Sequence, residues 1–162
     1  MMRKTMILAS VAALAFIVGV VPGCRAKTPN APEAKAEHKA WHNGCLNAMG
    51  HCENGHAETR IEGQTLKLWF VGGGNDTNLA VRVPDKEFTL TVTLDGAAEP
   101  KTLLLTAKPS ELSEEKEGDC SHFEGSADWL KDAKKFVATG SVTFKGRKQD
   151  IRIEYPEGYD PD

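Results

Sequence analysis

The sequence predicts a mainly β protein, an antiparallel β-sandwich of immunoglobulin-like size that follows a Cys/His-rich loop segment and a disordered tether. Short runs of alternating apolar and polar residues recur from residue 57 onward. Turn residues, such as those at Gly63 and at Asp95-Gly96, separate the runs. No stretch has the length and period of a long helix. Strands without helical crossovers favour a sandwich.

The β region is expected to hold about seven or eight strands. The clearest is FTLTVTL at Phe88–Leu94, which alternates strictly. A hairpin turn is expected at 62–64 and another at 145–148. The predicted strands cover residues 57–61, 65–71, 78–83, 88–94, 101–107, 121–124, 136–144 and 149–155, and one helical turn is predicted at 127–131.

The alternation also predicts which side chains face the core, although a shift of one residue inverts a strand. Trp69 falls on the outward side of its strand, where we expect it to pack against a neighbouring loop. The predicted inward residues are Leu66, Leu68, Phe70, Phe88, Leu90, Val92, Leu94, Leu103, Leu105, Phe123, Val137, Val142, Phe144, Ile151 and Ile153.

The N-terminus has the features of an export signal. Two basic residues precede an uncharged apolar run at Met6–Val21, whose length suits a secretory signal and is short for a membrane span. Val21-Pro22-Gly23-Cys24 resembles the bacterial lipobox, which implies cleavage before Cys24 and a lipid such as palmitate on its thiol. Residues 25–37 are rich in Ala, Pro, Lys and Glu and are predicted to form a flexible tether.

These features predict the domain organisation. The expected parts are a signal peptide with lipobox at 1–23, a lipid anchor and linker at 24–37, a Cys/His-rich motif at 38–56, a β-sandwich at 57–156 and a loose tail at 157–162.

The histidines and the remaining cysteines are confined to two short segments, and the stretch 57–119 contains neither residue type. Because thiolates and imidazoles bind soft and borderline metals, this clustering predicts a site for a transition-metal ion such as Zn or Cu. The candidate ligands are Cys45, Cys52, Cys120, His51, His56, His122, His42 and His38.

The three thiols leave two alternatives open. Cys45, Cys52 and Cys120 could act together as thiolate ligands, with His51, His56 or His122 in the fourth position. Alternatively, two of them could form a disulfide in an exported compartment, which would leave one thiol unpaired. In that case the protein would be a non-catalytic structural or protein-interaction module.

Other functions are not supported by the sequence. The formal net charge is −3, and it becomes more negative without residues 1–23, because they contain Arg3 and Lys4 but no acidic residue. An acidic chain of this kind is not suited to bind nucleic acid. No Cys-x-x-Cys motif is present for redox work or haem attachment. Cys120 and His122 lack a visible oxyanion donor, so we do not expect an enzyme.

Several segments together resemble a known module. They are His56-Ala57-Glu58, Leu66–Phe70, Leu94-Asp95-Gly96, Glu117–Phe123 and Lys145-Gly146. They are similar to the small β-sandwich of bacterial lipoproteins and of periplasmic subunits that accompany heavy-metal efflux pumps. In that family the position of Cys120 is more often Ser. The resemblance implies a binding or accessory role in the cell envelope.

We therefore expect an exported envelope lipoprotein that faces the periplasm or the exterior. Its expected partners are the membrane, through lipid on Cys24, and an envelope protein such as a metal-efflux component.

Overall fold

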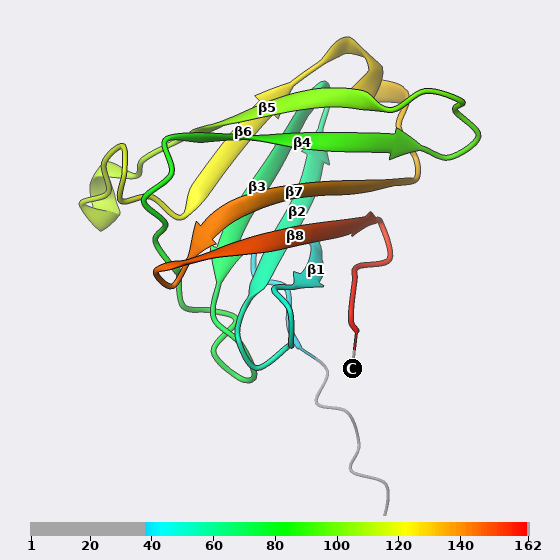
Figure 1. Ribbon diagram of the computed structural model, residues 1–162. Coiled ribbons are helices and arrows are strands. Elements are labelled where there is room, and N and C mark those ends of the chain that lie inside the picture. Colours follow the sequence, from blue (N-terminus) through cyan, green and yellow to red (C-terminus); the bar gives the residue numbers. More distant parts are fainter. Residues whose placement is uncertain (1–37, 162) are drawn as a thin grey trace, which may run out of the picture. The chain divides into compact units, whose positions relative to one another are not determined.

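The structure is a computed structural model that describes residues 38–161 (Figure 1). The predicted signal peptide, Cys24 and the tether lie outside the described residues. Within 38–161 no helix is long and apolar enough to span a bilayer. The strands are β1 (Cys45–Ala48), β2 (His56–Glu62), β3 (Thr65–Val71), β4 (Glu87–Leu94), β5 (Lys101–Ala107), β6 (His122–Ser126), β7 (Phe136–Phe144) and β8 (Arg147–Tyr155). Two short 3₁₀ helices are η1 (Glu111–Ser113) and η2 (Asp128–Asp132).

The eight strands form one antiparallel sheet in the order β1-β2-β3-β6-β5-β4-β7-β8, which confirms the predicted mainly β class. The two layers of the sandwich come from this single sheet bending over itself, and Figure 1 shows β2 and β3 crossing behind β4, β7 and β8 at a steep angle. β6 joins the layers because it pairs with β3 and with β5. Gly125 permits the close approach, since a Cβ there would lie 2.4 Å from the Leu104 carbonyl oxygen.

The sheet is nearly closed where β1 approaches β8. The fully buried Asn47 bridges the two strands, because its Oδ1 accepts a 2.8 Å hydrogen bond from the Glu154 N–H. The C-terminal tail pairs with β1 as well: Ala48 N–H donates to the Tyr159 carbonyl at 2.7 Å. The tail, expected to be loose, is therefore bonded through Tyr159, because β1 offers backbone groups that need partners.

Two elements differ from the sequence prediction. β1 was not predicted, because its four residues lie inside the Cys/His-rich segment and show no alternation. The predicted strand at 78–83 makes only isolated bridges, from Val71 to Ala80 and from Val83 to Cys120. A turn at 76–79 overlaps the start of this stretch and Pro84, which has no N–H, follows it, so it cannot pair as a longer strand.

The core is centred on four phenylalanines from different strands, with ring centroids 5.1–6.0 Å apart: Phe70, Phe88, Phe123 and Phe144. The predicted inward residues are buried except Leu94 and Val137, which are half-buried. Val137 was assigned to the wrong face, because Phe136 and Ala138 point inward on β7. Leu94 lies at the end of β4 and packs against the rim of the core.

Phe70→Ala should destabilise the protein by about 3–5 kcal/mol, because it leaves a cavity among the packed rings. Val137→Ala is the matched control and should cost less than about 1 kcal/mol, because its side chain is on the outer face. Urea unfolding of the two variants measures the difference. Equal losses would contradict the assigned faces of β7.

Candidate functional site

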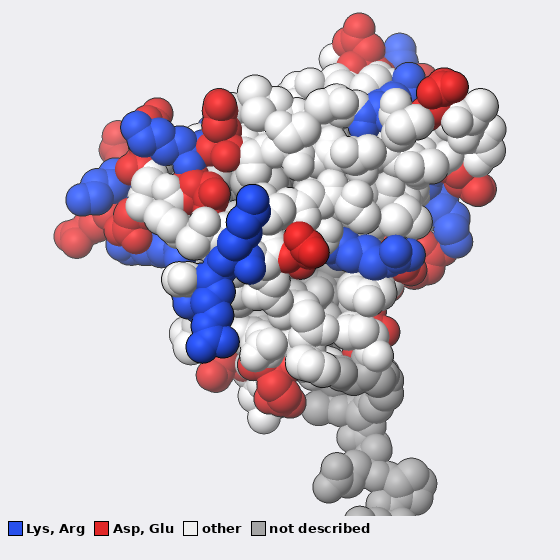
Figure 2. Space-filling view, in the orientation of Figure 1, with Lys and Arg blue, Asp and Glu red and all other residues white. Residues whose placement is uncertain are grey.

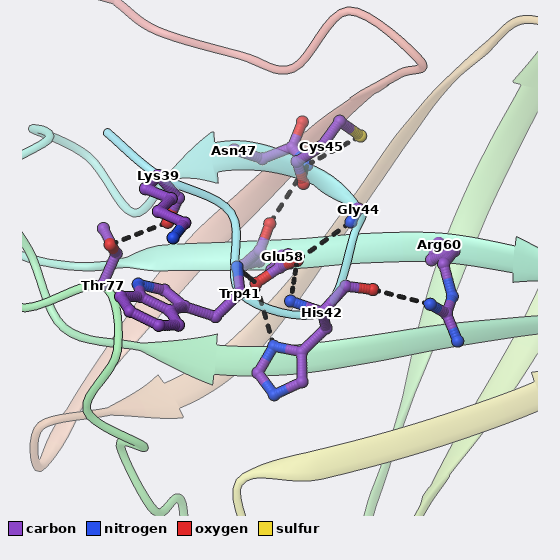
Figure 3. Close-up of polar contacts among 10 residues, drawn as sticks. Lys39, Trp41, His42, Gly44, Cys45, Asn47, Glu58, Arg60 and Thr77 are labelled. Atoms are coloured by element: carbon purple, nitrogen blue, oxygen red, sulfur yellow. Dashed lines mark hydrogen bonds and ion pairs between the residues drawn. The ribbon is translucent and has the colours of Figure 1, made fainter. Parts of the chain in front are cut away.

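Residues 38–44, which we call the strap, precede β1 and cross β2 and β3 (Figure 3). At one end the Thr77 hydroxyl donates to the Lys39 carbonyl at 2.8 Å, and at the other Arg60 Nη1 donates to the His42 carbonyl at 2.8 Å. Gly44 allows the strap to lie directly on β2, because a Cβ there would come within 2.5 Å of the Thr59 carbonyl oxygen.

The strap is held by the carboxylate of Glu58 on β2, whose side chain is fully buried. The carboxylate accepts hydrogen bonds from the backbone N–H of Trp41 at 3.0 Å, of His42 at 2.6 Å and of Gly44 at 2.9 Å. His42 Nδ1 adds a fourth bond at 2.9 Å. Burial alone would raise the pKa of Glu58, but these four bonds outweigh burial and hold the pKa below its ordinary value.

Three aromatic rings, one of them from the strap, form a stack. Trp69 lies between His42, at a centroid distance of 4.4 Å, and His122, at 4.7 Å, with interplanar angles of 3° and 7°. Trp69 therefore packs against a neighbouring loop, here the strap, as predicted. Burial lowers the pKa of His122, although the charge of Glu124 opposes the shift. Because a ring separates the two imidazoles, they cannot share a metal ion.

His38 and His56 are the two candidate ligands that the structure does bring together. His38 Nδ1 lies 3.2 Å from His56 Nε2. The other nitrogen of His56, Nδ1, donates to the Gly72 carbonyl at 3.2 Å, so the Nε2 lone pair faces His38. Burial lowers the pKa of His56, which is only 4% exposed, so this imidazole is neutral at neutral pH.

The three cysteines within the described residues form no disulfide with one another and lie in separate surroundings. Cys45 Sγ contacts the Thr59 hydroxyl at 3.1 Å, and Cys52 Sγ lies 3.5 Å from Asp160 Oδ1. Cys120 is buried, with its Sγ 3.1 Å from the His122 carbonyl oxygen. Burial raises the pKa of Cys45 and of Cys120. The predicted set of three thiolates is therefore not assembled, and the expected disulfide is not seen among these residues.

The exposed His51 lies with Cys52 in the turn between β1 and β2. Among the described residues, no group of three or more His, Cys, Asp and Glu side chains is placed to hold a metal ion. The assembled part of the predicted site is thus the pair of imidazoles from His38 and His56.

Glu58 is the residue that sequence reasoning missed. Its alternation places it on the outer face with Arg60 and Glu62, and nothing in the sequence distinguishes it from these surface charges. Comparisons with family models, with curated proteins and with solved structures find no match. The chemistry of the site is therefore derived from its own residues.

Glu58→Gln should release the strap, because an amide places N–H donors against the donors that now bind a carboxylate. We expect a loss of about 2–4 kcal/mol at neutral pH and faster amide exchange at Gly44. Glu62→Gln is the matched control, since Glu62 is half exposed and pairs with Arg60 and Lys67 at the surface. It should change stability by less than about 1 kcal/mol.

The same variant tests the pH dependence. Because the folded-state pKa of Glu58 lies below the ordinary value of 4.5, its contribution is complete above that value and is lost as the pH falls through the folded pKa. Glu115, whose pKa is also lowered, contributes to the same window. The stability of Glu58→Gln should therefore fall less than that of the wild type below about pH 4.5. Parallel curves would contradict an ionised Glu58.

Proposed function

We propose that this protein is a bacterial envelope lipoprotein that binds one soft or borderline transition-metal ion, Zn or Cu, and assists in metal handling or efflux. Lipid on Cys24 would anchor it to a membrane, and the ion would be held by His38 Nδ1 and His56 Nε2. The association with an efflux component rests on the resemblance of the β module to subunits of that kind.

The observation that carries the proposal is the separation of the two imidazole nitrogens. Two nitrogens bound to a tetrahedral ion at about 2.0–2.1 Å lie about 3.3 Å apart. His38 Nδ1 and His56 Nε2 are 3.2 Å apart. Without metal a proton on His38 Nδ1 can bridge the same gap, so the pair is a hydrogen bond that an ion can replace.

The surroundings of His56 support a role as a metal ligand. Its second nitrogen is held by the Gly72 carbonyl, which is the arrangement that orients ligating histidines in metalloproteins. Since burial keeps this imidazole neutral, binding at neutral pH requires no deprotonation of His56.

Two carboxylates act electrostatically on the proposed ligand His56. The carboxylates of Asp160 and Glu53 act on the His56 ring, in the direction that raises its pKa. The thiol of Cys52 lies 3.5 Å from the Oδ1 of the same Asp160. An ion held by two imidazoles retains open positions, which suits delivery to a partner that offers more ligands.

The proposal uses fewer residues than the sequence predicted. His42 and His122 are committed to the Trp69 stack, and Cys45 and Cys120 point into other contacts. The alternative expectation, an interaction module stapled by a disulfide, has no bond between the described cysteines to support it.

The test is a titration of the untagged full chain with Zn²⁺ and Cu²⁺, followed by native mass spectrometry and calorimetry. The wild type should bind one ion. His38→Ala and His56→Gln should each weaken binding by at least about tenfold, because each removes one ligand. His51→Ala is the matched control, since it removes an exposed imidazole from the adjacent turn, and it should bind as the wild type does.

Unchanged affinity in a folded His56→Gln protein would refute the proposed site. Circular dichroism of each variant verifies that the sheet is intact. A wild type that binds neither ion would refute metal handling altogether.

A further inference from the structure

A groove of about 620 Å³ lies beside the C-terminal tail, in a part of the molecule that the proposed metal site does not use. This volume is within the range of about 300–1,000 Å³ that is typical of small-molecule sites. The groove is lined by residues of β4, β7 and β8, of the end of β1 and the turn after it, and of the tail, and they include Thr89, Thr91, Thr139, Asp150, Arg152 and Tyr159.

Exposed hydroxyl groups and two opposite charges form the floor. Thr91, Thr139 and Arg152 lie side by side in one row across three strands, since Thr91 pairs with Thr139 and Thr139 with Arg152. Thr89 and Asp150 also have exposed side chains. Alternation places Leu90 and Val92 in the core, so these polar side chains point outward. Figure 2 shows a broad uncharged area over β4, β5 and β7 on this face.

Tyr159 lines one side of the groove, and its backbone is hydrogen-bonded to β1. Its N–H donates to the Leu46 carbonyl at 3.2 Å, and its carbonyl accepts from Ala48 N–H at 2.7 Å. The Arg152 guanidinium lies 5.2 Å from the centre of the Tyr159 ring. An aromatic ring on an ordered backbone therefore stands next to a hydroxyl-lined floor, which lowers the entropic cost of binding.

We propose that this groove binds a neutral oligosaccharide. A sugar presents C–H groups on its ring faces, which pack on an aromatic ring, and hydroxyls at its edges. Threonine hydroxyls both donate and accept, the Asp150 carboxylate can accept from two neighbouring hydroxyls, and Arg152 has further N–H donors beside those that contact Glu154.

The same lining disfavours other ligand classes. One carboxylate and one guanidinium give the groove no net charge, and Arg152 already pairs with Glu154, so a phosphate or another polyanion has no cationic cluster to bind. An apolar ligand would cover threonine hydroxyls without replacing their hydrogen bonds to water. An extended peptide binds at a sheet edge, whereas this groove lies on a sheet face.

The test uses the full chain with two neutral probes, the tetramers of N-acetylglucosamine and of glucose. Amide chemical-shift mapping should show saturable changes at Thr139, Arg152 and Tyr159 with at least one tetramer. Tyr159→Ala should weaken binding by at least about tenfold. Because this change also loosens the tail, Thr139→Val is the second variant; it preserves shape on an exposed strand and should weaken binding about threefold or more.

Thr102→Val is the matched control, because Thr102 pairs with Thr91 from β5 but does not line the groove. Its affinity should equal that of the wild type. Absence of shifts with both tetramers would overturn the proposal, as would unchanged binding in Thr139→Val. Tighter binding of a tetragalacturonate or of a peptide would overturn the assignment to neutral sugars. None of these outcomes depends on metal binding.

Discussion

The buried carboxylate of Glu58 determines the path of the chain before β1. Three of its four hydrogen bonds satisfy the backbone N–H groups of Trp41, His42 and Gly44, which would otherwise lack partners against the sheet, and the fourth comes from His42 Nδ1. The strap they hold carries His42 onto Trp69 and leads back to His38, which meets His56 on β2. One acidic residue of β2 thus holds the strap in place, and the imidazole pair depends on that arrangement.

The sequence predicts the β class and most strands because alternation reports directly which side chains must leave water, as in Phe88–Leu94. It fails where the partner is distant or the pattern is short. β1 has four residues without alternation, and the tail is ordered through the backbone of Tyr159 pairing with β1, which side-chain patterns do not encode. Val137 belongs to β7, where apolar residues occur on both faces near its start, so the inward face was ambiguous from the sequence.

The residue types of the candidate site can be predicted from the sequence, but the way they come together in the fold cannot. Clustering along the sequence identifies the residue types that bind metals, but in the folded chain each histidine and cysteine has different contacts. His42 is hydrogen-bonded to Glu58 and stacks on Trp69, whereas the Nε2 lone pair of His56 faces His38. Cys120 lies just before β6, and its Sγ contacts the Glu115 carboxylate and the His122 carbonyl, where burial raises the pKa of the thiol and favours its neutral form. Spacing along the chain carries no information about these orientations, because they follow from how the strap crosses the sheet.

The central claim, that His38 and His56 form a paired imidazole site, is tested most directly by imidazole ¹⁵N NMR of the full chain before and after one equivalent of Zn²⁺. The proposed geometry predicts that His38 Nδ1 and His56 Nε2 shift together on binding, while His56 Nδ1 remains protonated against the Gly72 carbonyl. Shifts confined to other histidines, or no shift at either nitrogen, would contradict it.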